Sequence, residues 1–162
     1  GLDAAVIAGP GSAGQPAGIV NTAGITSASG SSVNWAALVK LQRTAGDANS
    51  SAEAFAYAAT PAVAELLANK QRFAGTNSSL WEGPLADGTV AGARAMSSAQ
   101  VPAATIVAGP WEEIAVGEWG ILEIAVNPYA NFQSALVGVR AMWTVDVGIR
   151  HAATFSVLTN VS

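Results

Sequence analysis

The sequence has no cysteine and only one histidine among its 162 residues. A chain without cysteine forms no disulfide and offers no thiolate nucleophile, iron–sulfur ligand or sulfur-ligated zinc site. The single histidine, His151, is too little for a multi-histidine metal site. We therefore expect no metal centre and no catalysis by cysteine.

Charge is also scarce, because only 11% of the residues are charged. Acidic residues outnumber basic ones by 11 to 7, which gives a formal net charge of −4. Tight binding of nucleic acid needs a basic cluster that displaces counterions from the phosphates. The basic residues are instead scattered, so the sequence predicts at most weak, nonspecific contact with DNA; they are Lys40, Arg43, Lys70, Arg72, Arg94, Arg140 and Arg150.

Long apolar runs are missing too, although 51% of the residues are hydrophobic. The longest stretch without charge, residues 4–39, is interrupted by glycine, proline and polar residues, so no 18-residue apolar span exists. We expect no membrane partner and one core-bearing domain, which can be divided into two lobes. Because the sequence begins Gly1-Leu2-Asp3 and shows no signal peptide, we interpret it as a fragment or a processed product.

Helical patterns occupy two places in the first half of the chain, whose first forty residues otherwise look irregular. Apolar spacing predicts a helix over residues 33–45, capped by Ser31 or Ser32 and ending at Gly46. A second helix begins at Pro61, with Thr60 as its cap, and should end near residue 72. Between them, residues 52–59 alternate bulky side chains with alanine, which predicts a strand with one buried face.

The second half of the sequence is rich in short strands between glycine, proline and serine. We expect strands over 89–96, 105–108, 113–117, 120–126 and 155–158. The β-rich run from residue 133 to 150 is longer than a compact domain of this size needs, since a strand rises about 3.3 Å per residue. It predicts an elongated lobe, and its folding into a compact barrel would contradict that prediction.

A glycine-rich segment raises the possibility of a dinucleotide site. Gly9, Gly11 and Gly14 match the pattern G-x-G-x-x-G after an apolar run. Pro16 stands where the helix should continue, no acidic residue for a ribose follows before Asp47, and no βαβ unit is predicted. We therefore expect no cofactor.

Candidate catalytic side chains are few. His151 could act as a base with Asp146, but five residues along a strand place the two side chains on opposite faces, and no G-x-S-x-G nucleophile turn exists. Four glutamates could form a carboxylate pair or a cation site, but their mutual geometry is not fixed by sequence, and ion pairs with Arg94, Arg140 or Arg150 are favoured; they are Glu112, Glu113, Glu118 and Glu123.

Tryptophan occurs five times, at positions 35, 81, 111, 119 and 143. These rings could stack on sugars or on single-stranded nucleic acid, but we favour roles in cores and in contacts between subunits. A β-rich domain that binds or cleaves glycans through Trp81, Trp111 and Glu112 stays open as an alternative.

The order of several motifs resembles one known family. They are Leu2-Asp3-Ala4-Ala5 to Gly18-Ile19-Val20-Asn21, Thr60-Pro61, Ala108-Gly109-Pro110-Trp111, Asn127-Pro128-Tyr129, and Gly138 to His151. From Leu2 to about Val157 the chain resembles the major capsid proteins of tailed double-stranded DNA phages, the Hong Kong 97 type of fold. The order of these motifs along the chain carries the resemblance.

The resemblance implies an α+β fold that is a partial capsid fold. Residues 1–21 would be a peripheral-domain segment, 22–126 an axial domain with a small sheet flanked by two helices, and 127–162 the long peripheral strands. The family's N-terminal arm, extended loop and spine helix are absent from this sequence. Some relatives crosslink a lysine of that loop to an asparagine, but Ser134 stands at the acceptor position here.

The function implied is structural, without catalytic, cofactor-binding or metal-binding residues. Copies would assemble as hexamers and pentamers into an icosahedral shell around double-stranded DNA, although this fragment alone could stay monomeric. The protein would occur in the virion and, during assembly, in the bacterial cytoplasm, with a prophage as a possible source. A bacterial nanocompartment shell of the same fold is the alternative.

Overall fold

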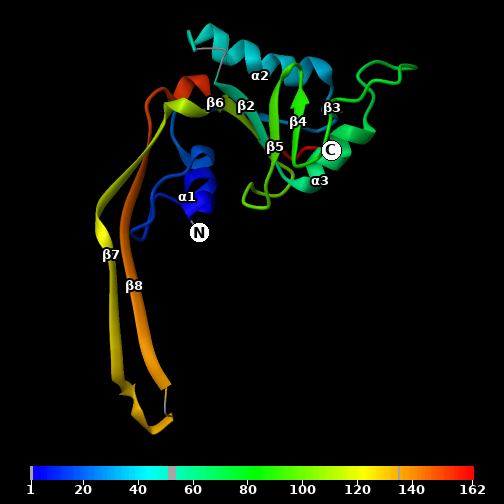
Figure 1. Ribbon diagram of the computed structural model, residues 1–162. Coiled ribbons are helices and arrows are strands. Elements are labelled where there is room, and N and C mark those ends of the chain that lie inside the picture. Colours follow the sequence, from blue (N-terminus) through cyan, green and yellow to red (C-terminus); the bar gives the residue numbers. More distant parts are fainter. Residues whose placement is uncertain (1, 51–53, 135) are drawn as a thin grey trace.

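The computed structural model describes residues 2–50, 54–134 and 136–162. A mixed sheet with helices on it forms a compact part, and one long two-stranded hairpin projects from it (Figure 1). The elongated lobe expected from residues 133–150 is therefore confirmed. So is the expected α+β class.

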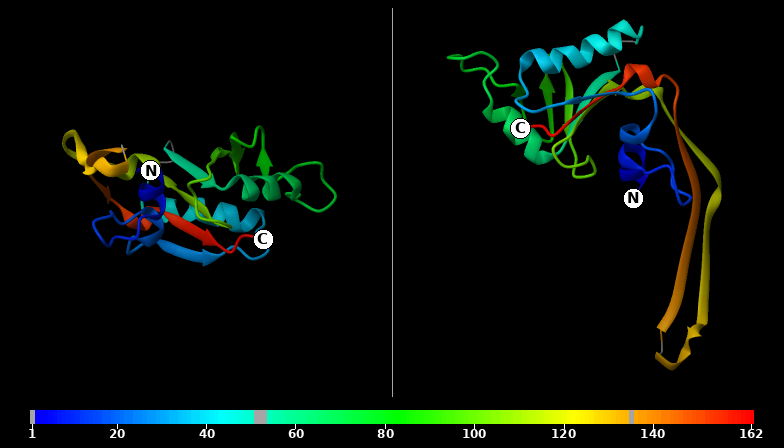
Figure 2. Two further views of the ribbon diagram at one scale, coloured as in Figure 1. Left: turned by 90° about the horizontal axis from the view of Figure 1, so that it is seen from below. Right: turned by 180° about the vertical axis from the view of Figure 1, so that it is seen from behind.

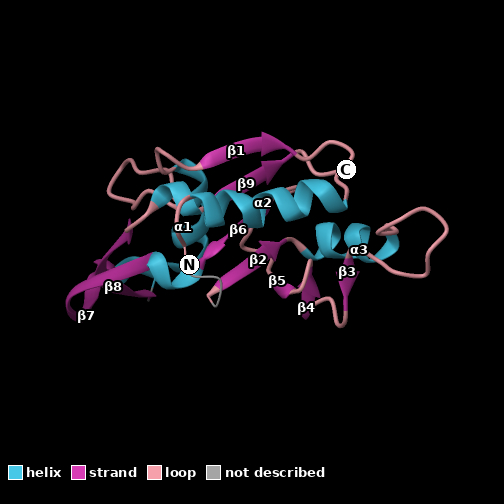
Figure 3. Ribbon diagram, turned by 90° about the horizontal axis from the view of Figure 1, so that it is seen from above, coloured by secondary structure: helices cyan, strands magenta, loops and turns pink. Residues whose placement is uncertain are grey.

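Seven strands form the sheet in the order β1-β9-β6-β2-β5-β4-β3, which the view from above follows edge to edge (Figure 3). Strands β2 and β6 pair antiparallel at its centre, while β2–β5 and β1–β9 are parallel pairs. The strands are β1 (Thr26–Ser29), β2 (Phe55–Ala59), β3 (Trp81–Glu82), β4 (Asp87–Val90), β5 (Ala93–Ser97), β6 (Ile106–Pro110) and β9 (Ser156–Thr159).

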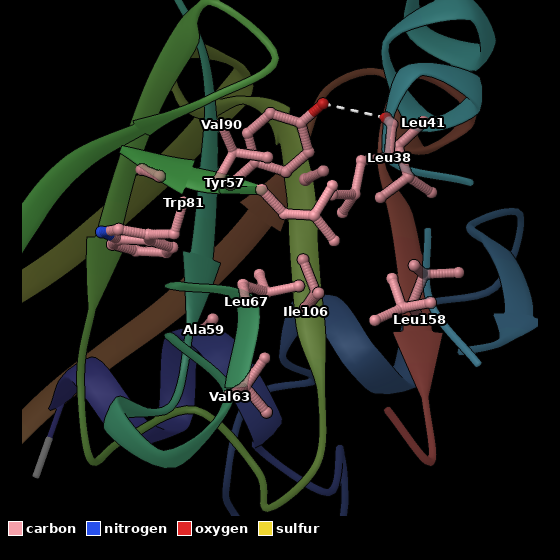
Figure 4. Packing of buried hydrophobic residues seen from close by; sticks show 14 of the residues in the cluster. Leu38, Leu41, Tyr57, Ala59, Val63, Leu67, Trp81, Val90, Ile106 and Leu158 are labelled. Carbon is pink, nitrogen blue, oxygen red and sulfur yellow. Dashed lines mark hydrogen bonds between the residues drawn. The ribbon is translucent and has the colours of Figure 1, made fainter. Parts of the chain in front are cut away.

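The main core lies between the sheet and two helices, α2 (Trp35–Asp47) and α3 (Pro61–Asn69). Leu38 and Leu67 of these helices pack on Tyr57 and Ile106 of the central strands (Figure 4). The Tyr57 hydroxyl donates a 2.9 Å hydrogen bond to the Leu38 carbonyl, so strand and helix are also joined by a buried polar contact.

The opposite face of the sheet is covered as well. Helix α1 (Leu2–Ala8) and the 3-10 turn η1 (Ile19–Asn21) bring Ile7 and Ile19 against Val107 and Phe155. Strand β2 is therefore buried at every residue, so the prediction that only one of its faces is buried was wrong. Of the predicted strand 52–59, residues 52 and 53 lie outside the described residues. The helix α1 and strand β1 were not expected in the first forty residues.

Helix ends follow local capping chemistry. Thr60 accepts a hydrogen bond from the Val63 amide and Pro61 opens α3, as predicted, although this helix ends at Asn69 rather than near Arg72. Helix α2 is capped by Asn34, which accepts from the Ala37 amide at 2.9 Å, and not by Ser31 or Ser32. It runs on to Asp47 and includes Gly46.

The predicted single strand 89–96 is a tight hairpin instead. Ala91 and Gly92 both have positive φ, at 51° and 80°, which is the two-residue turn whose twist matches paired strands. Strands β4 and β5 pair antiparallel on either side of it.

The projecting hairpin consists of β7 (Ile114–Asn131) and β8 (Leu136–Ile149), joined by a 3-10 turn η3 (Phe132–Ser134). Strand β7 unites the two strands predicted over 113–117 and 120–126. Between them the register shifts near Gly120, whose φ is +79°, and the strand bends there without ending (Figure 1).

Candidate functional site

The two strands of the hairpin present two chemically different faces. Residues that face each other across an antiparallel pair lie on the same side, and side chains alternate between sides. Val116 pairs with Val147 and Val126 with Val139, so one side, which we call the apolar hairpin face, is apolar apart from Glu118. Its members are Ile114, Val116, Glu118, Ile124, Val126, Val137, Val139, Ala141, Trp143, Val145, Val147 and Ile149.

The other side, the polar hairpin face, carries mixed residues. Trp119 pairs with Thr144, Glu123 with Met142, and Asp146 stands opposite Gly117. Arg140 also lies on this side, opposite Ala125. This pattern is typical of an antiparallel strand pair that packs on other protein with one face and is exposed to solvent on the other.

Most of the apolar hairpin face is open to solvent in the single chain. Val139 is 68% exposed, Val126 61% and Ile124 60%. Monomeric soluble proteins rarely expose a contiguous apolar surface of this extent, and such surfaces mark contacts with other chains or segments. The apolar hairpin face is the candidate functional site.

Only the root of this face is covered. Val147 is 9% exposed, and Ile114 and Ile149 pack against the cluster that contains Ile7 of α1. Farther out, a hollow of about 390 Å³ separates α1 and the loop after it from Trp143 and Val145. The hairpin leaves the compact part beside α1 and extends well beyond it (Figure 2). Along it, the apolar hairpin face runs from the buried Val147 at the root onto exposed strands, with Glu118 as a charged member.

The junction between sheet and hairpin holds the one histidine. His151 Nδ1 lies 2.9 Å from Glu113 Oε2, Arg150 Nε lies 3.7 Å from the same oxygen, and the Arg150 amide donates to the Glu113 carbonyl. The expected pairing of a glutamate with Arg150 is confirmed. The His151 side chain is exposed, and within the described residues its ring is hydrogen-bonded to Glu113 rather than to Asp146 or a hydroxyl nucleophile.

The remaining acidic candidates do not converge. Glu118 and Glu123 lie on opposite faces of β7 and are exposed, and Arg94 pairs with Asp87 rather than with a glutamate of this group. The Arg94 guanidinium lowers the pKa of Asp87 through a hydrogen bond. Within residues 2–50, 54–134 and 136–162, no group of three or more potential metal ligands gathers.

The glycine-rich segment forms a tight loop rather than a phosphate cradle. The Gly18 amide donates to the Gly9 carbonyl at 2.9 Å, and a Cβ on Gly9 would lie 2.2 Å from the Pro16 carbonyl oxygen. The Asn21 side chain also donates to the Gly9 carbonyl. Close backbone approach therefore explains Gly9 and Gly18.

The tryptophans divide between core and hairpin. Trp81 is 2% exposed and donates its indole N–H to the Pro84 carbonyl, and Trp111 donates to the Ala56 carbonyl and meets the Phe155 ring edge to face. Buried rings cannot stack on sugar, so the glycan site at Trp81, Trp111 and Glu112 was a wrong hypothesis as far as Trp81 is concerned. Trp119 and Trp143 are exposed on the hairpin.

No helix in the described part of the chain is long and apolar enough to span a membrane.

The long strand was predicted from the sequence, but the grouping of its apolar side chains on one face was not. The signal was present, because odd positions from Val137 to Ile149 are apolar while even ones include Arg140, Thr144 and Asp146. Which residues of the partner strand share this face could not be predicted, because that depends on the bulge near Gly120.

Solved structures with this fold are shell proteins. The capsid of an empty GTA particle matches with a TM-score of 0.69 and 17% identity over 99% of this chain and 62% of that chain. A chain of Mycobacterium phage Ogopogo matches with a TM-score of 0.64 and 17% identity, over 97% of this chain and 62% of that chain. A virus-like particle from Pyrococcus furiosus matches with a TM-score of 0.59 and 14% identity, over 86% of this chain and 58% of that chain. The fold is thus that of a phage capsid, as the resemblance implied.

The family follows from sequence comparison. Residues 1–160 match the Phage capsid family, and the chain belongs to it. The major capsid protein of Halomonas phage phiHAP-1 is 31% identical over 158 residues. That match covers 96% of this chain but 25% of the phage protein, so the chain spans about a quarter of that relative.

Proposed function

We propose that the protein is a major capsid protein, whose copies form the shell of a phage head around double-stranded DNA. Membership of the Phage capsid family and the capsid fold support this function. Hexamers and pentamers of the chain would be the building units. The virion would be its place, with the bacterial cytoplasm as the site of assembly and a prophage as a possible origin.

The observation that carries the proposal is the exposed apolar hairpin face. A two-stranded hairpin is only marginally stable alone in water and needs a packing partner. Here the root has one in α1, while Val126, Val137 and Val139 have none among the described residues. We therefore propose that assembly buries this face.

We also propose which part of the chain occupies which capsid domain. The sheet with α2 and α3 would be the axial domain at capsomer centres, and the hairpin would belong to the peripheral domain. The expected boundary at residues 126 and 127 falls inside β7, so the hairpin as a whole, 114–149, is the unit that projects. The boundaries 1–21, 22–126 and 127–162 remain a prediction about places in a capsomer.

The same protein would have no enzymatic activity and would hold DNA weakly. Function would lie in surfaces that fit other copies. Scattered arginines and a net charge of −4 support confinement of DNA rather than tight attachment to it.

A nanocompartment shell is the second candidate, because a virus-like particle shares the fold. The relative named as a phage major capsid protein favours the phage head. Terminase and portal genes beside this gene would support the phage head, and the gene of a cargo peroxidase would support the compartment.

A single charge on the apolar hairpin face tests the proposal. In the full-length protein, Val139→Lys should abolish particles, because each copy would bury an unpaired ammonium where it now buries an aliphatic side chain. We expect a loss of at least about 2 kcal/mol per copy, roughly 30-fold in the association constant. Particle yield is read by sedimentation and electron microscopy.

Thr144→Lys is the matched control, since it adds the same charge to the same strand, five residues from Val139 and on the polar hairpin face, where Thr144 pairs with Trp119. It should assemble like the wild type. Normal particles from Val139→Lys, or equal loss in both variants, would contradict the proposed role of the apolar face.

A further inference from the structure

One edge of the seven-stranded sheet exposes hydrogen-bonding groups without protection. Strand β1 ends the strand order, and all four of its residues are exposed. The Thr26 and Gly30 amides donate to Phe155 and Thr159 of the β9 region, so by the period of two the amides and carbonyls of Ser27 and Ser29 point away from β9. Backbone donors and acceptors thus face outward along this edge.

The opposite edge of the same sheet is guarded. Strand β3 has only two residues, it includes Glu82, and Pro84 follows two residues after its end. Short length, charge and proline are the devices by which proteins keep other strands from adding to a sheet edge. Around β1, by contrast, no charged residue occurs between Asp3 and Lys40, and no proline occurs after Pro16 in that interval.

We propose that the β1 edge is an assembly contact, at which an extended segment of a neighbouring copy of this chain adds to the sheet as a further strand. The inference rests on the proposed function, because it takes the neighbour from shell formation. Strand addition uses backbone hydrogen bonds, and the side chains only have to allow close approach. Ser27, Ala28 and Ser29 are small and uncharged, so they allow it.

The absence of charge also favours a second copy as the occupant. If the neighbouring copy offers its own β1 edge, identical residues lie near one another, and charged residues there would repel their own kind. The edge sequence Thr26-Ser27-Ala28-Ser29 carries no such penalty. The sheet would then continue from one subunit into the next.

The substitution Ser27→Pro tests this contact without disturbing the fold of the subunit. Ser27→Pro removes an outward N–H that β9 does not use, and proline is tolerated on an edge strand when its N–H side faces solvent. In the full-length protein it should leave thermal unfolding of the subunit within a few degrees of the wild type. It should raise the concentration needed for assembly at least tenfold, whereas Ser27→Ala, which keeps the N–H, should assemble normally.

Hydrogen exchange provides a second readout that needs no variant. The Ser27 and Ser29 amides should exchange fast in dissociated wild-type subunits and at least a hundredfold more slowly in particles. Particles whose Ser27 and Ser29 amides exchange freely, normal assembly of Ser27→Pro, or protection already complete in single subunits would each overturn the edge contact and leave the shell function intact. A full-length protein that never forms particles would overturn both.

Discussion

At the scale of residues, two glycines show how the same residue type serves different purposes. A Cβ on Gly109 of β6 would lie 2.3 Å from Cδ1 of Phe155, a fully buried ring that is held against Trp111. Gly46 in α2 has no atom within 4 Å of such a Cβ, and its φ is not positive. One glycine is therefore required by packing, and the other is not.

These environments predict opposite effects of alanine. Gly109→Ala should destabilise the fold by about 1–3 kcal/mol, because the ring has no room to move. Gly46→Ala should stabilise it by about 0.5 kcal/mol, since alanine loses less entropy in a helix. Urea unfolding of the two variants measures both changes, and a neutral Gly109→Ala would contradict the packing described for Phe155.

Tyr57 predicts a dependence of stability on pH. Burial raises its pKa above the ordinary value of 10.0. In the unfolded chain the phenol ionises above about pH 10, while in the fold it keeps its proton, so stability is complete below pH 10 and falls by about 1.4 kcal/mol per pH unit above it.

Tyr57→Phe isolates this contribution. Near pH 7 the variant should be about 1 kcal/mol less stable, because the bond to the Leu38 carbonyl is lost. Above pH 10 the difference should shrink and then reverse. Unfolding free energies of both proteins between pH 7 and 11.5 give the comparison, and parallel curves would mean that the phenol ionises equally in both states.

At the scale of elements, local chemistry allowed one helix start to be predicted but not the other. Thr60 followed by Pro61 is a cap with a preorganised first residue, and the structure confirms it. Before α2, three polar residues compete, and Ser32 takes positive φ at 59°, which turns the chain so that Asn34 becomes the cap. Such a backbone choice is not visible in the residue types alone.

The cap of α2 can be tested directly. Asn34→Ala should cost about 1 kcal/mol of stability, because the Ala37 amide loses its acceptor. Ser31→Ala should change stability by less than about 0.5 kcal/mol. Thermal unfolding of both variants would decide, and a larger loss at Ser31 would restore the serine cap.

Strands were predicted well where the local sequence pattern determines them, and badly where tertiary contacts do. The alternation of Phe55 and Tyr57 with alanines indicated a strand, yet α1 and η1 on the far side bury Ala58 as well. The turn at Ala91 and Gly92 was missed because alanine rarely takes positive φ. The pairing of β4 with β3 and with β5 holds Ala91 in this conformation.

At the scale of the whole molecule, the chain combines a well-packed sheet with a hairpin that has little to pack on. The order of motifs predicted the family, and the long β-rich run predicted the projecting shape. The apolar hairpin face could not be predicted from one strand, because its width depends on how β7 and β8 pair across the bulge near Gly120. An exposed apolar surface of this kind is what the proposed assembly would bury.

The central claim is that shell formation buries the apolar hairpin face. The most direct measurement is electron cryomicroscopy of the purified full-length protein at side-chain resolution. We expect closed particles in which the side chains of Val126, Val137 and Val139 are covered by protein. Monomers at every concentration, or particles in which these three side chains face solvent, would contradict it.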